Sequence, residues 1–239
     1  MAHSVAQDCR LYVGPTDFSG DSNSIDPRAG TTVVEDGPTF GQTVITNLAG
    51  LTNWSIGAAG LLTIANDGSD EMLHTDWDRG TDVFTASPTG TDGDRCWFGQ
   101  VTQSEFRRQS RMNDVLKWTW GGASRSVLVP GFIIHTKASR STTGNGTAFQ
   151  LGAVAAGKSL YAALHVFTAT GTTLDVKVQS DDNSGMSSAT DRITFTQVAT
   201  TPTSLFSSVA GSITDDYWRI VYTISGTGPY VLAVAAGIL

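Results

Sequence analysis

Short runs in which apolar and polar residues alternate dominate the second half of the chain. The clearest are SLYAALHVFTATG, TTLDVKVQSDDNSG, DRITFTQVATTP and DDYWRIVYTISGTG, and each ends at a Gly, Pro or Asx turn signal. A period of two is typical of half-buried strands, and turn signals at this spacing are typical of a two-sheet sandwich. The pattern therefore predicts a mostly β fold in which residues 146–239 form a C-terminal β-sandwich.

The first half shows the same periodicity with more interruptions. Strands are predicted at Leu11–Val13, in RCWFGQV and in VLKWTWGG, where Leu116, Trp118 and Trp120 alternate onto one face. The stretch from Phe40 to Ile64 predicts two strands with a tight connection, because Gly and Asn residues break its β-branched runs.

Trp54 and Ile56 lie two positions apart in that stretch, so we expect them to share one face. The segments GPTDFSGDSNSIDPRAG and TQSEFRRQSRMND are predicted to be connections, because turn-forming or charged residues replace the apolar alternation. Pro130-Gly131 is expected to break SVLVPGFIIHT into two strand fragments. One short helix is predicted from Ser69 to Trp77, with Ser69 as its N-cap.

A polar, glycine-bearing stretch, KASRSTTGNGTAF, separates the two halves. Domain boundaries fall in exposed segments of this composition. We therefore place a first domain at residues 1–145 and a second at residues 146–239.

Composition and charge narrow the classes of function. The formal net charge is −7, which disfavours a general nucleic-acid or anionic-membrane binder, because such binders present Lys and Arg surfaces. The two cysteines, Cys9 and Cys96, stand far apart and outside any CxxC motif, so we expect unpaired thiols and no zinc site. No basic leader with an apolar run and no bilayer-length apolar stretch occurs, so we expect assembly in the cytoplasm and no membrane partner.

GAVAAGKS, from Gly152 to Ser159, matches the phosphate-loop pattern of nucleotide-binding proteins. That loop must connect a buried strand to a helix, whose N-terminus faces the phosphates. The residues after Lys158 instead alternate like a strand, so a turn that leads into the sandwich is favoured over an ATP site. We accordingly predict no cofactor and no enzymatic activity; an NTPase that uses Lys158 is the alternative.

SDDNSG, from Ser180 to Gly185, resembles the start of a calcium loop. The chain has Arg192 where the final bidentate Glu of such a loop would stand, and the flanking runs are strand-like. A hairpin turn is therefore favoured, with a weak surface calcium site as the alternative.

Three arginines form a basic cluster in this acidic chain: Arg107, Arg108 and Arg111 precede Lys117, Trp118 and Trp120. Basic and aromatic residues together are typical of grooves that bind single-stranded nucleic acid. Arginine is also well suited to ion pairs at protein interfaces. The negative total charge favours the interface reading, with pairing to acidic groups of the same chain or of a neighbouring subunit.

The second half, SLYAALHVFTATGTTLDVKVQSDDNSGMSSATDRITFTQV and TDDYWRIVYTISGTGPYVLAVAAGIL, resembles the C-terminal β-sandwich of major tail proteins of long-tailed bacteriophages. More loosely, LYVGPTDFSGDSNSID resembles the first strand and arm of phage tail-tube proteins. GLTNWSIGAAGLLTI resembles the strands before their short helix. The resemblance covers most of the chain as a pattern of strands and turns.

This resemblance implies an N-terminal tail-tube-like β-sandwich or barrel with one short helix, followed by the C-terminal sandwich on the outside of the tube. It implies stacked, hexameric rings in the virion tail, with contacts to other tail proteins and with DNA that passes through the lumen without specific binding. It places subunit contacts in 17–30 and 102–114, and the expected contact residues are Asp17, Phe18, Asp21, Arg107, Arg108 and Arg111.

Other virion roles fit the same pattern of strands. A capsid decoration protein, a tail terminator or a tail-tip protein can carry a sandwich of this kind. An adhesion module that binds host-surface glycans is a further alternative, with Tyr217 or Trp218 exposed near the sandwich loops to stack on sugars.

Overall fold

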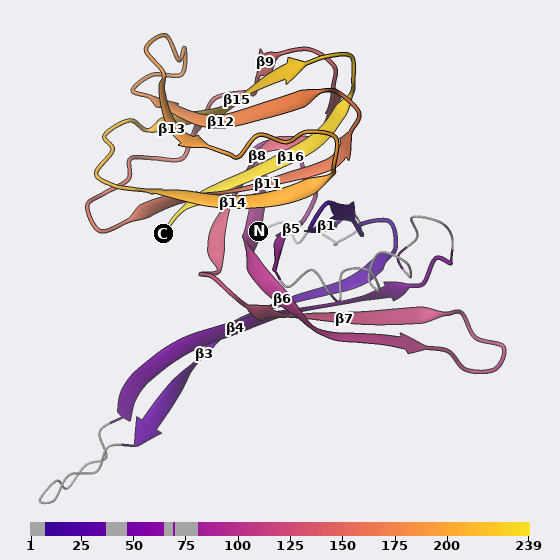
Figure 1. Cartoon of the computed structure of the whole chain (residues 1–239). Helices are drawn as coiled ribbons and strands as arrows, with labels where there is room; N and C mark the ends of the chain where they lie inside the picture. The colour runs from indigo at the N-terminus through magenta and orange to yellow at the C-terminus, as the bar shows by residue number, and fades with distance from the viewer. Residues whose placement is uncertain (1–7, 37–46, 65–68, 70–80) are drawn as a thin grey trace, which may run out of the picture.

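Antiparallel strands make up most of the molecule (Figure 1). The computed structural model describes residues 8–36, 47–64, 69 and 81–239. Most of these described residues lie in strands, which confirms the expected mostly β fold. The strands are β1 (Arg10–Val13), β2 (Thr16–Asp17), β3 (Ser22–Asp36), β4 (Asn47–Leu61), β5 (Asp82–Ser87), β6 (Arg95–Gln109), β7 (Lys117–Ser124), β8 (Val129–Arg140), β9 (Gly144–Asn145), β10 (Phe149–Gln150), β11 (Ser159–Ala169), β12 (Thr173–Asp181), β13 (Thr190–Thr194), β14 (Thr203–Ala210), β15 (Tyr217–Ser225) and β16 (Tyr230–Ile238).

Two sheets contain these strands. The smaller has the order β10-β15-β12-β13, and β9 pairs with β15. The larger, with eleven strands, has the order β14-β11-β16-β8-β6-β5-β1-β2. Its remaining strands branch from β6, because the first half of β6 pairs with β5 and β8 while its second half pairs with β7, which pairs in turn with β4.

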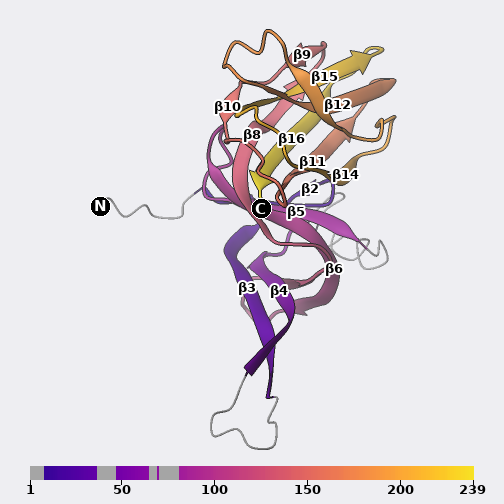
Figure 2. The ribbon, with the colours of Figure 1, turned by 90° about the vertical axis from the view of Figure 1, so that its left-hand side faces the viewer.

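The C-terminal sandwich consists of the five-stranded sheet packed on β14, β11, β16 and β8 (Figure 1, Figure 2). Alternate residues of β12 and β15 are buried, as the period-two pattern predicted. Among them Val176, Val178, Trp218 and Ile220 share one core with Leu164 of β11. The strand β8 precedes residue 146 and pairs with β16, so the larger sheet runs through both halves of the chain. The division at residue 145 stays a prediction.

The larger sheet curls until β5 lies against β11 and β14. The backbone N–H of Val83 donates to the hydroxyl of Ser204 at 3.4 Å, which links β5 to β14. Inside the curl, Val83, Phe98 and Ile133 form a separate apolar core. The ring of Phe206 packs against this core with its centroid 6.2 Å from that of Phe98. This half-closed barrel joins the sandwich to the N-terminal strands.

Two long hairpins, β3–β4 and β6–β7, extend from the N-terminal part. Pairing between β4 and β7 joins them, and Figure 1 shows that they project in opposite directions from this pairing. Trp54 and Ile56 of β4 and Trp118 and Trp120 of β7 are buried in one core, so these shared faces are confirmed. The prediction was wrong for Leu116, which precedes β7 and is 37% exposed. Phe18 closes this core, with its ring centroid 5.9 Å from that of Trp118.

Several stretches that were predicted as loops or broken strands are parts of continuous strands. Residues 22–30 belong to β3 and 102–109 to β6, so these loop predictions were wrong. The second half of β6 is largely exposed, and an exposed strand does not need apolar alternation. The predicted break at Pro130-Gly131 is also wrong, because proline is tolerated near the start of a strand, where it stands in β8.

The stretch from Phe40 to Ile64 contains one described strand, 47–61, where two with a tight connection were predicted. Residues 40–46 lie outside the described part. The predicted helix also lies outside it apart from Ser69, whose hydroxyl accepts a hydrogen bond from the N–H of Thr63 at 3.0 Å.

Gly60 shows why glycine interrupts the strand pattern without ending the strand. A Cβ at this position would lie 1.8 Å from the carbonyl oxygen of Asp21, which accepts a hydrogen bond from Leu61 N at 2.8 Å. A Cβ at Gly57 of the same strand would have no neighbour within 4 Å.

We expect Gly60→Ala to lower the free energy of unfolding by about 1–3 kcal/mol, because the start of β3 must move to admit the methyl group. Gly57→Ala is the matched control and should leave stability unchanged or raise it by about 0.4–1 kcal/mol. Urea unfolding of the two variants measures the difference. Equal stabilities would contradict the close approach at Gly60.

GAVAAGKS forms a turn that leads into β11, as predicted, and no helix follows Lys158. Gly152 and Gly157 adopt φ values of +94° and +79°, which glycine reaches without strain. The N–H of Lys158 donates to the carbonyl of Ala155 at 3.1 Å and closes the turn. The helix N-terminus that a phosphate loop requires is therefore replaced by a strand.

SDDNSG connects β12 to β13 through Asx turns, which confirms the hairpin reading. The N–H of Gly185 donates to Oδ1 of Asn183 at 2.9 Å, and the N–H of Ser188 donates to Oδ2 of Asp181 at 2.7 Å. The bond from Ser188 is the main cause that lowers the pKa of Asp181. Its carboxylate therefore serves the backbone of its own turn.

Candidate assembly surface

The connection between β6 and β7 forms the far end of a protruding hairpin. The strands stay paired up to Gln109 and Lys117, and the chain then reverses direction. Asn113 has a φ of +65°, a left-handed conformation that asparagine adopts more easily than most residues, and Asp114 N donates to the carbonyl of Arg111 at 3.0 Å. We refer to residues 105–117 as the tip.

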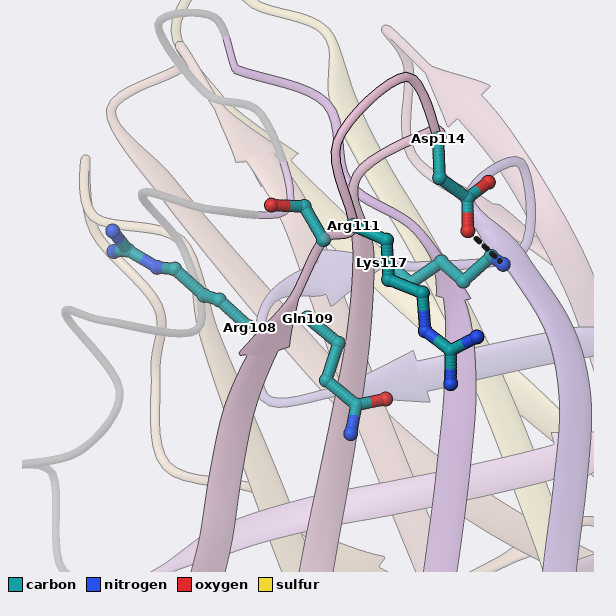
Figure 3. Close-up of a pocket in the computed structure, with 6 residues that line it drawn as sticks. Arg108, Gln109, Arg111, Asp114 and Lys117 are labelled. Carbon is teal, nitrogen blue, oxygen red and sulfur yellow. Dashed lines mark hydrogen bonds and ion pairs between the residues drawn. The ribbon is translucent and has the colours of Figure 1, made fainter.

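A hollow of about 540 Å³ opens at the tip (Figure 3). Its lining is mainly basic and polar: Arg108, Gln109, Ser110, Arg111, Asp114 and Lys117. The ammonium of Lys117 lies 3.1 Å from Oδ2 of Asp114, and this hydrogen bond is the main cause that lowers the pKa of the Asp114 carboxyl. The tip carries four basic residues and two acidic residues, so its net charge is +2.

The ion pairs of the tip are open to solvent. Nε of Arg107 lies 2.5 Å from Oε1 of Glu105, and their side chains are 68% and 46% exposed. Exposed pairs of this kind contribute about 0–1 kcal/mol, so they can rearrange on contact with another molecule at little cost. The Arg108 guanidinium lies 5.6 Å from the centroid of the Phe106 ring, which leaves it at the surface of the hairpin.

Apolar side chains accompany these charges. Met112 is 96% exposed, Val115 is 55% exposed and Leu116 is 37% exposed. The N–H of Leu62 donates to the carbonyl of Leu116 at 2.9 Å, which brings the end of β4 beside the tip. Ile64, 69% exposed, follows directly after that end. Exposed apolar side chains gathered on a projection are typical of a surface that binds another protein.

The first of the two segments expected to make subunit contacts, 17–30, contacts the base of this hairpin at residues outside the second segment, 102–114. Phe18 packs on Trp118, and the carbonyl of Asp21 binds the N–H of Leu61, which faces Lys117 in register. Phe18 itself is only 2% exposed, so it supports the hairpin from inside the chain. Sequence reasoning found the arginines but missed the exposed Met112 and Val115: Met112 stands in a stretch without apolar alternation, whereas Val115 begins the stretch VLKWTWGG that was predicted as a strand.

Asp17 lies apart from the tip. Its carboxylate is 2.7 Å from the Lys137 ammonium on β8 and also accepts hydrogen bonds from Ser19. Burial raises its pKa, but the bonds from Lys137 and Ser19 outweigh burial and hold the pKa below the usual value. Asp17 therefore ties the β1–β2 turn to the sandwich in this chain, and its place in a subunit contact stays a prediction.

A buried histidine next to this pair was not singled out by the sequence. Nδ1 of His165 lies 2.8 Å from the carbonyl of Gly14, and Nε2 lies 2.8 Å from the hydroxyl of Thr85. Because a carbonyl only accepts, Nδ1 donates and Nε2 of the neutral ring accepts from Thr85. Burial is the main cause that lowers the pKa of His165 to about 4. The neutral ring joins β1, β5 and β11.

Trp218 does not provide a sugar-stacking surface. It is fully buried, and its Nε1 donates to the carbonyl of Gly152 at 2.9 Å, so the prediction that it is exposed was wrong. Tyr217 is half-buried in β15. The alternation that marked β15 as a strand also requires one of two adjacent aromatic residues to face the core.

The described residues contain no group of three or more His, Cys, Asp and Glu side chains placed to hold a metal ion. None of their helices is long and apolar enough to cross a bilayer. Cys9 and Cys96 are free thiols, and burial raises the pKa of Cys96.

No protein-family model and no curated protein matches the sequence. The structure resembles a chain in the tail of an empty GTA particle with C6 symmetry, at 18% identity and a TM-score of 0.37 over 49% of this chain and 92% of that one. It also resembles the SPP1 Dit protein, from the hub adsorption apparatus of phages that infect Gram-positive bacteria. The sequence identity is 10% and the TM-score is 0.37, over 98% of this chain and 100% of that one. A chain of the activated phage p2 baseplate is similar at 5% sequence identity and a TM-score of 0.36, over 95% of this chain and 97% of that one. TM-scores this low assign no role to the present chain.

Proposed function

We propose that this protein is a structural subunit of a bacteriophage tail, and that copies of it assemble as stacked, hexameric rings of the tail tube. In this proposal residues 1–145 form the wall of the tube and residues 146–239 decorate its outside. The chain binds copies of itself and other tail proteins, and it resides in the virion after assembly in the host cytoplasm. DNA passes through the lumen without specific binding.

One observation carries the assembly proposal: the β6–β7 hairpin projects from the molecule and exposes Met112 and Val115 among arginines at its end. A monomer gains nothing from apolar side chains held in water on a projection, whereas a subunit buries them in a neighbour. The tail assignment is supported by the resemblance of the strand pattern to major tail proteins. The net charge of −7 is consistent with a lumen that does not retain DNA.

We expect Met112→Asp to raise the protein concentration required for self-assembly by at least about tenfold, because a charge replaces an apolar contact at the interface. The fold should be unaffected, since Met112 is 96% exposed. Val127→Asp is the matched control, because Val127 is also exposed (41%) but lies between β7 and β8, away from the tip.

Sedimentation velocity over a range of concentrations measures this difference. Loss of assembly in both variants would show that an added negative charge prevents assembly wherever it is placed, and would contradict a specific role for the tip. Wild-type assembly of Met112→Asp would contradict a role for the tip.

A further inference from the structure

A second hollow, of about 310 Å³, lies where three parts of the chain come together. They are β1, the connection between β5 and β6 (88–94) and the middle of β8. The hydroxyl of Thr136 donates to the carbonyl of Gly90 at 2.7 Å and so joins two of the walls. We refer to this feature, which is separate from the tip, as the β1–β8 hollow. Its polar lining includes Arg10, Tyr12, Thr89, Thr91, Thr136 and Lys137.

Tyr12 forms a fixed wall of the β1–β8 hollow. The residue is 2% exposed, and its ring packs on the rings of Phe167 and His165, with centroids 5.0 and 5.6 Å away. Its hydroxyl oxygen lies beside Gly90, where a Cβ would be 3.3 Å from it. No residue in the described part of the chain forms a hydrogen bond with this hydroxyl, although a buried tyrosine hydroxyl usually has a partner. Burial raises the pKa of Tyr12 to about 12, so the hydroxyl keeps its proton and can donate to a ligand.

Two cationic side chains add further donors. Nε of Arg10 donates to the carbonyl of Thr89 at 3.4 Å, and the two terminal nitrogens of Arg10 bind no described residue. The Lys137 ammonium lies 2.7 Å from Oδ2 of Asp17 and carries two more N–H groups. Asp17 also accepts from the N–H of Ser19 at 3.0 Å, so its oxygens are used within the chain. With two positive charges and one negative charge, the lining carries a net charge of +1.

The carboxylates beside the β1–β8 hollow are occupied in the same way. Oδ2 of Asp94 accepts from the N–H of Thr89 at 2.8 Å and from the N–H of Gly90 at 3.1 Å. Oδ1 of Asp92 accepts from the N–H of Thr136 at 2.5 Å. The groups left for a ligand are therefore mainly donors, which select a molecule with acceptor oxygens. The two neighbouring carboxylates repel a second negative charge, so a singly charged carboxylate fits better than a phosphate.

Threonine hydroxyls add a second kind of contact. Oγ1 of Thr89 and Oγ1 of Thr91 lie 2.9 Å apart in the lining. A hydroxyl both donates and accepts, so this pair matches a ligand that itself carries hydroxyl groups.

We propose that the β1–β8 hollow binds a sugar acid of monosaccharide size, a ligand with one carboxylate and several hydroxyl groups. The carboxylate lies against Arg10 and Lys137, where charge-assisted hydrogen bonds are strong. Tyr12 donates to the same ligand, and the hydroxyls of Thr89 and Thr91 bind its hydroxyl groups. A volume of about 310 Å³ accommodates one sugar ring. Binding uses a single copy of the chain and does not depend on assembly.

Titration of the full chain with glucuronate, followed by saturation-transfer NMR, tests this proposal. We expect saturable binding that Arg10→Gln weakens at least about tenfold, because a charge-assisted hydrogen bond is lost. Tyr12→Phe should weaken binding by about three- to tenfold. Its unfolding temperature without ligand should equal that of the wild type, because the hydroxyl has no partner in the described part of the chain. Arg125→Gln is the matched control, since it removes the same charge at an exposed position outside the hollow, and it should bind like the wild type.

Glucose and acetate separate the two parts of the ligand. Each should bind at least about tenfold more weakly than glucuronate, because each lacks one of the two sets of contacts. Absence of saturable glucuronate binding overturns the proposal, and so does binding that Arg10→Gln and Tyr12→Phe leave unchanged. Glucose, acetate or inorganic phosphate that binds as tightly as glucuronate overturns the assignment to a sugar acid. None of these results depends on ring assembly, so a failure here leaves the proposed function intact.

Discussion

Replacing Trp218 with alanine is expected to lower the free energy of unfolding by about 3–5 kcal/mol. The side chain is fully buried between the two sheets of the sandwich, where its removal leaves a cavity. It also removes the donor to the Gly152 carbonyl, which lies 2.9 Å from Nε1. Because Gly152 begins the turn before β11, we expect the loss to affect both sheets.

Trp97→Ala provides the matched control, since Trp97 lies on β6 with 40% of its surface exposed. Its replacement by alanine should lower the free energy of unfolding by about 1 kcal/mol or less. Guanidinium unfolding followed by circular dichroism gives both values. A cost for Trp218→Ala as small as that for Trp97→Ala would contradict the placement of Trp218 in the core.

Mild acid is expected to destabilise the fold through His165. Burial lowers the pKa of this ring to about 4 in the folded chain, whereas the ring has its ordinary pKa of 6.5 when the chain is unfolded. Between these two pH values the unfolded chain takes up a proton that the folded chain refuses. The free energy of unfolding therefore falls as the pH falls from 6.5 towards 4, by an amount on the order of 3 kcal/mol.

His165→Gln should reduce the pH dependence in this window, even if it also lowers stability at neutral pH. His135 contributes in the same direction, because burial lowers its pKa to about 4 as well. In the variant, the slope of the unfolding free energy against pH should therefore be smaller than in the wild type, but not zero. Urea unfolding at several pH values between 4.5 and 7.5 measures both slopes. A variant whose slope equals that of the wild type would contradict a neutral, buried His165.

The sequence predicted the strands that have one buried face. In β12 and β15 alternate residues face a core, so the chemistry of each position reports its direction. The same reasoning paired Trp54 with Ile56 and Trp118 with Trp120 correctly. It failed at Pro130, because proline is tolerated near the start of a strand. It also gave no reason for Gly60, because the carbonyl of Asp21 that excludes a Cβ there comes from a distant part of the chain.

The candidate surface was only partly accessible from the sequence. Arg107, Arg108 and Arg111 form a recognisable cluster, but nothing in their spacing shows that β6 and β7 carry them outward on a hairpin. The exposure of Met112 is a property of the fold, since a lone methionine in a polar stretch is compatible with burial or exposure. Trp218 illustrates a missed signal, because Tyr217 is in phase with the charged Arg219 whereas Trp218 is in phase with Ile220, which indicates that Trp218 faces the core.

Electron microscopy of the purified full-length chain tests the central claim, assembly of copies into rings, most directly. We predict closed rings or short tubes at high protein concentration, with the β6–β7 hairpin of each copy in contact with its neighbour and the sandwich on the outer side. A field of separate monomers at every concentration, or an assembly in which the tip faces solvent, would contradict the account.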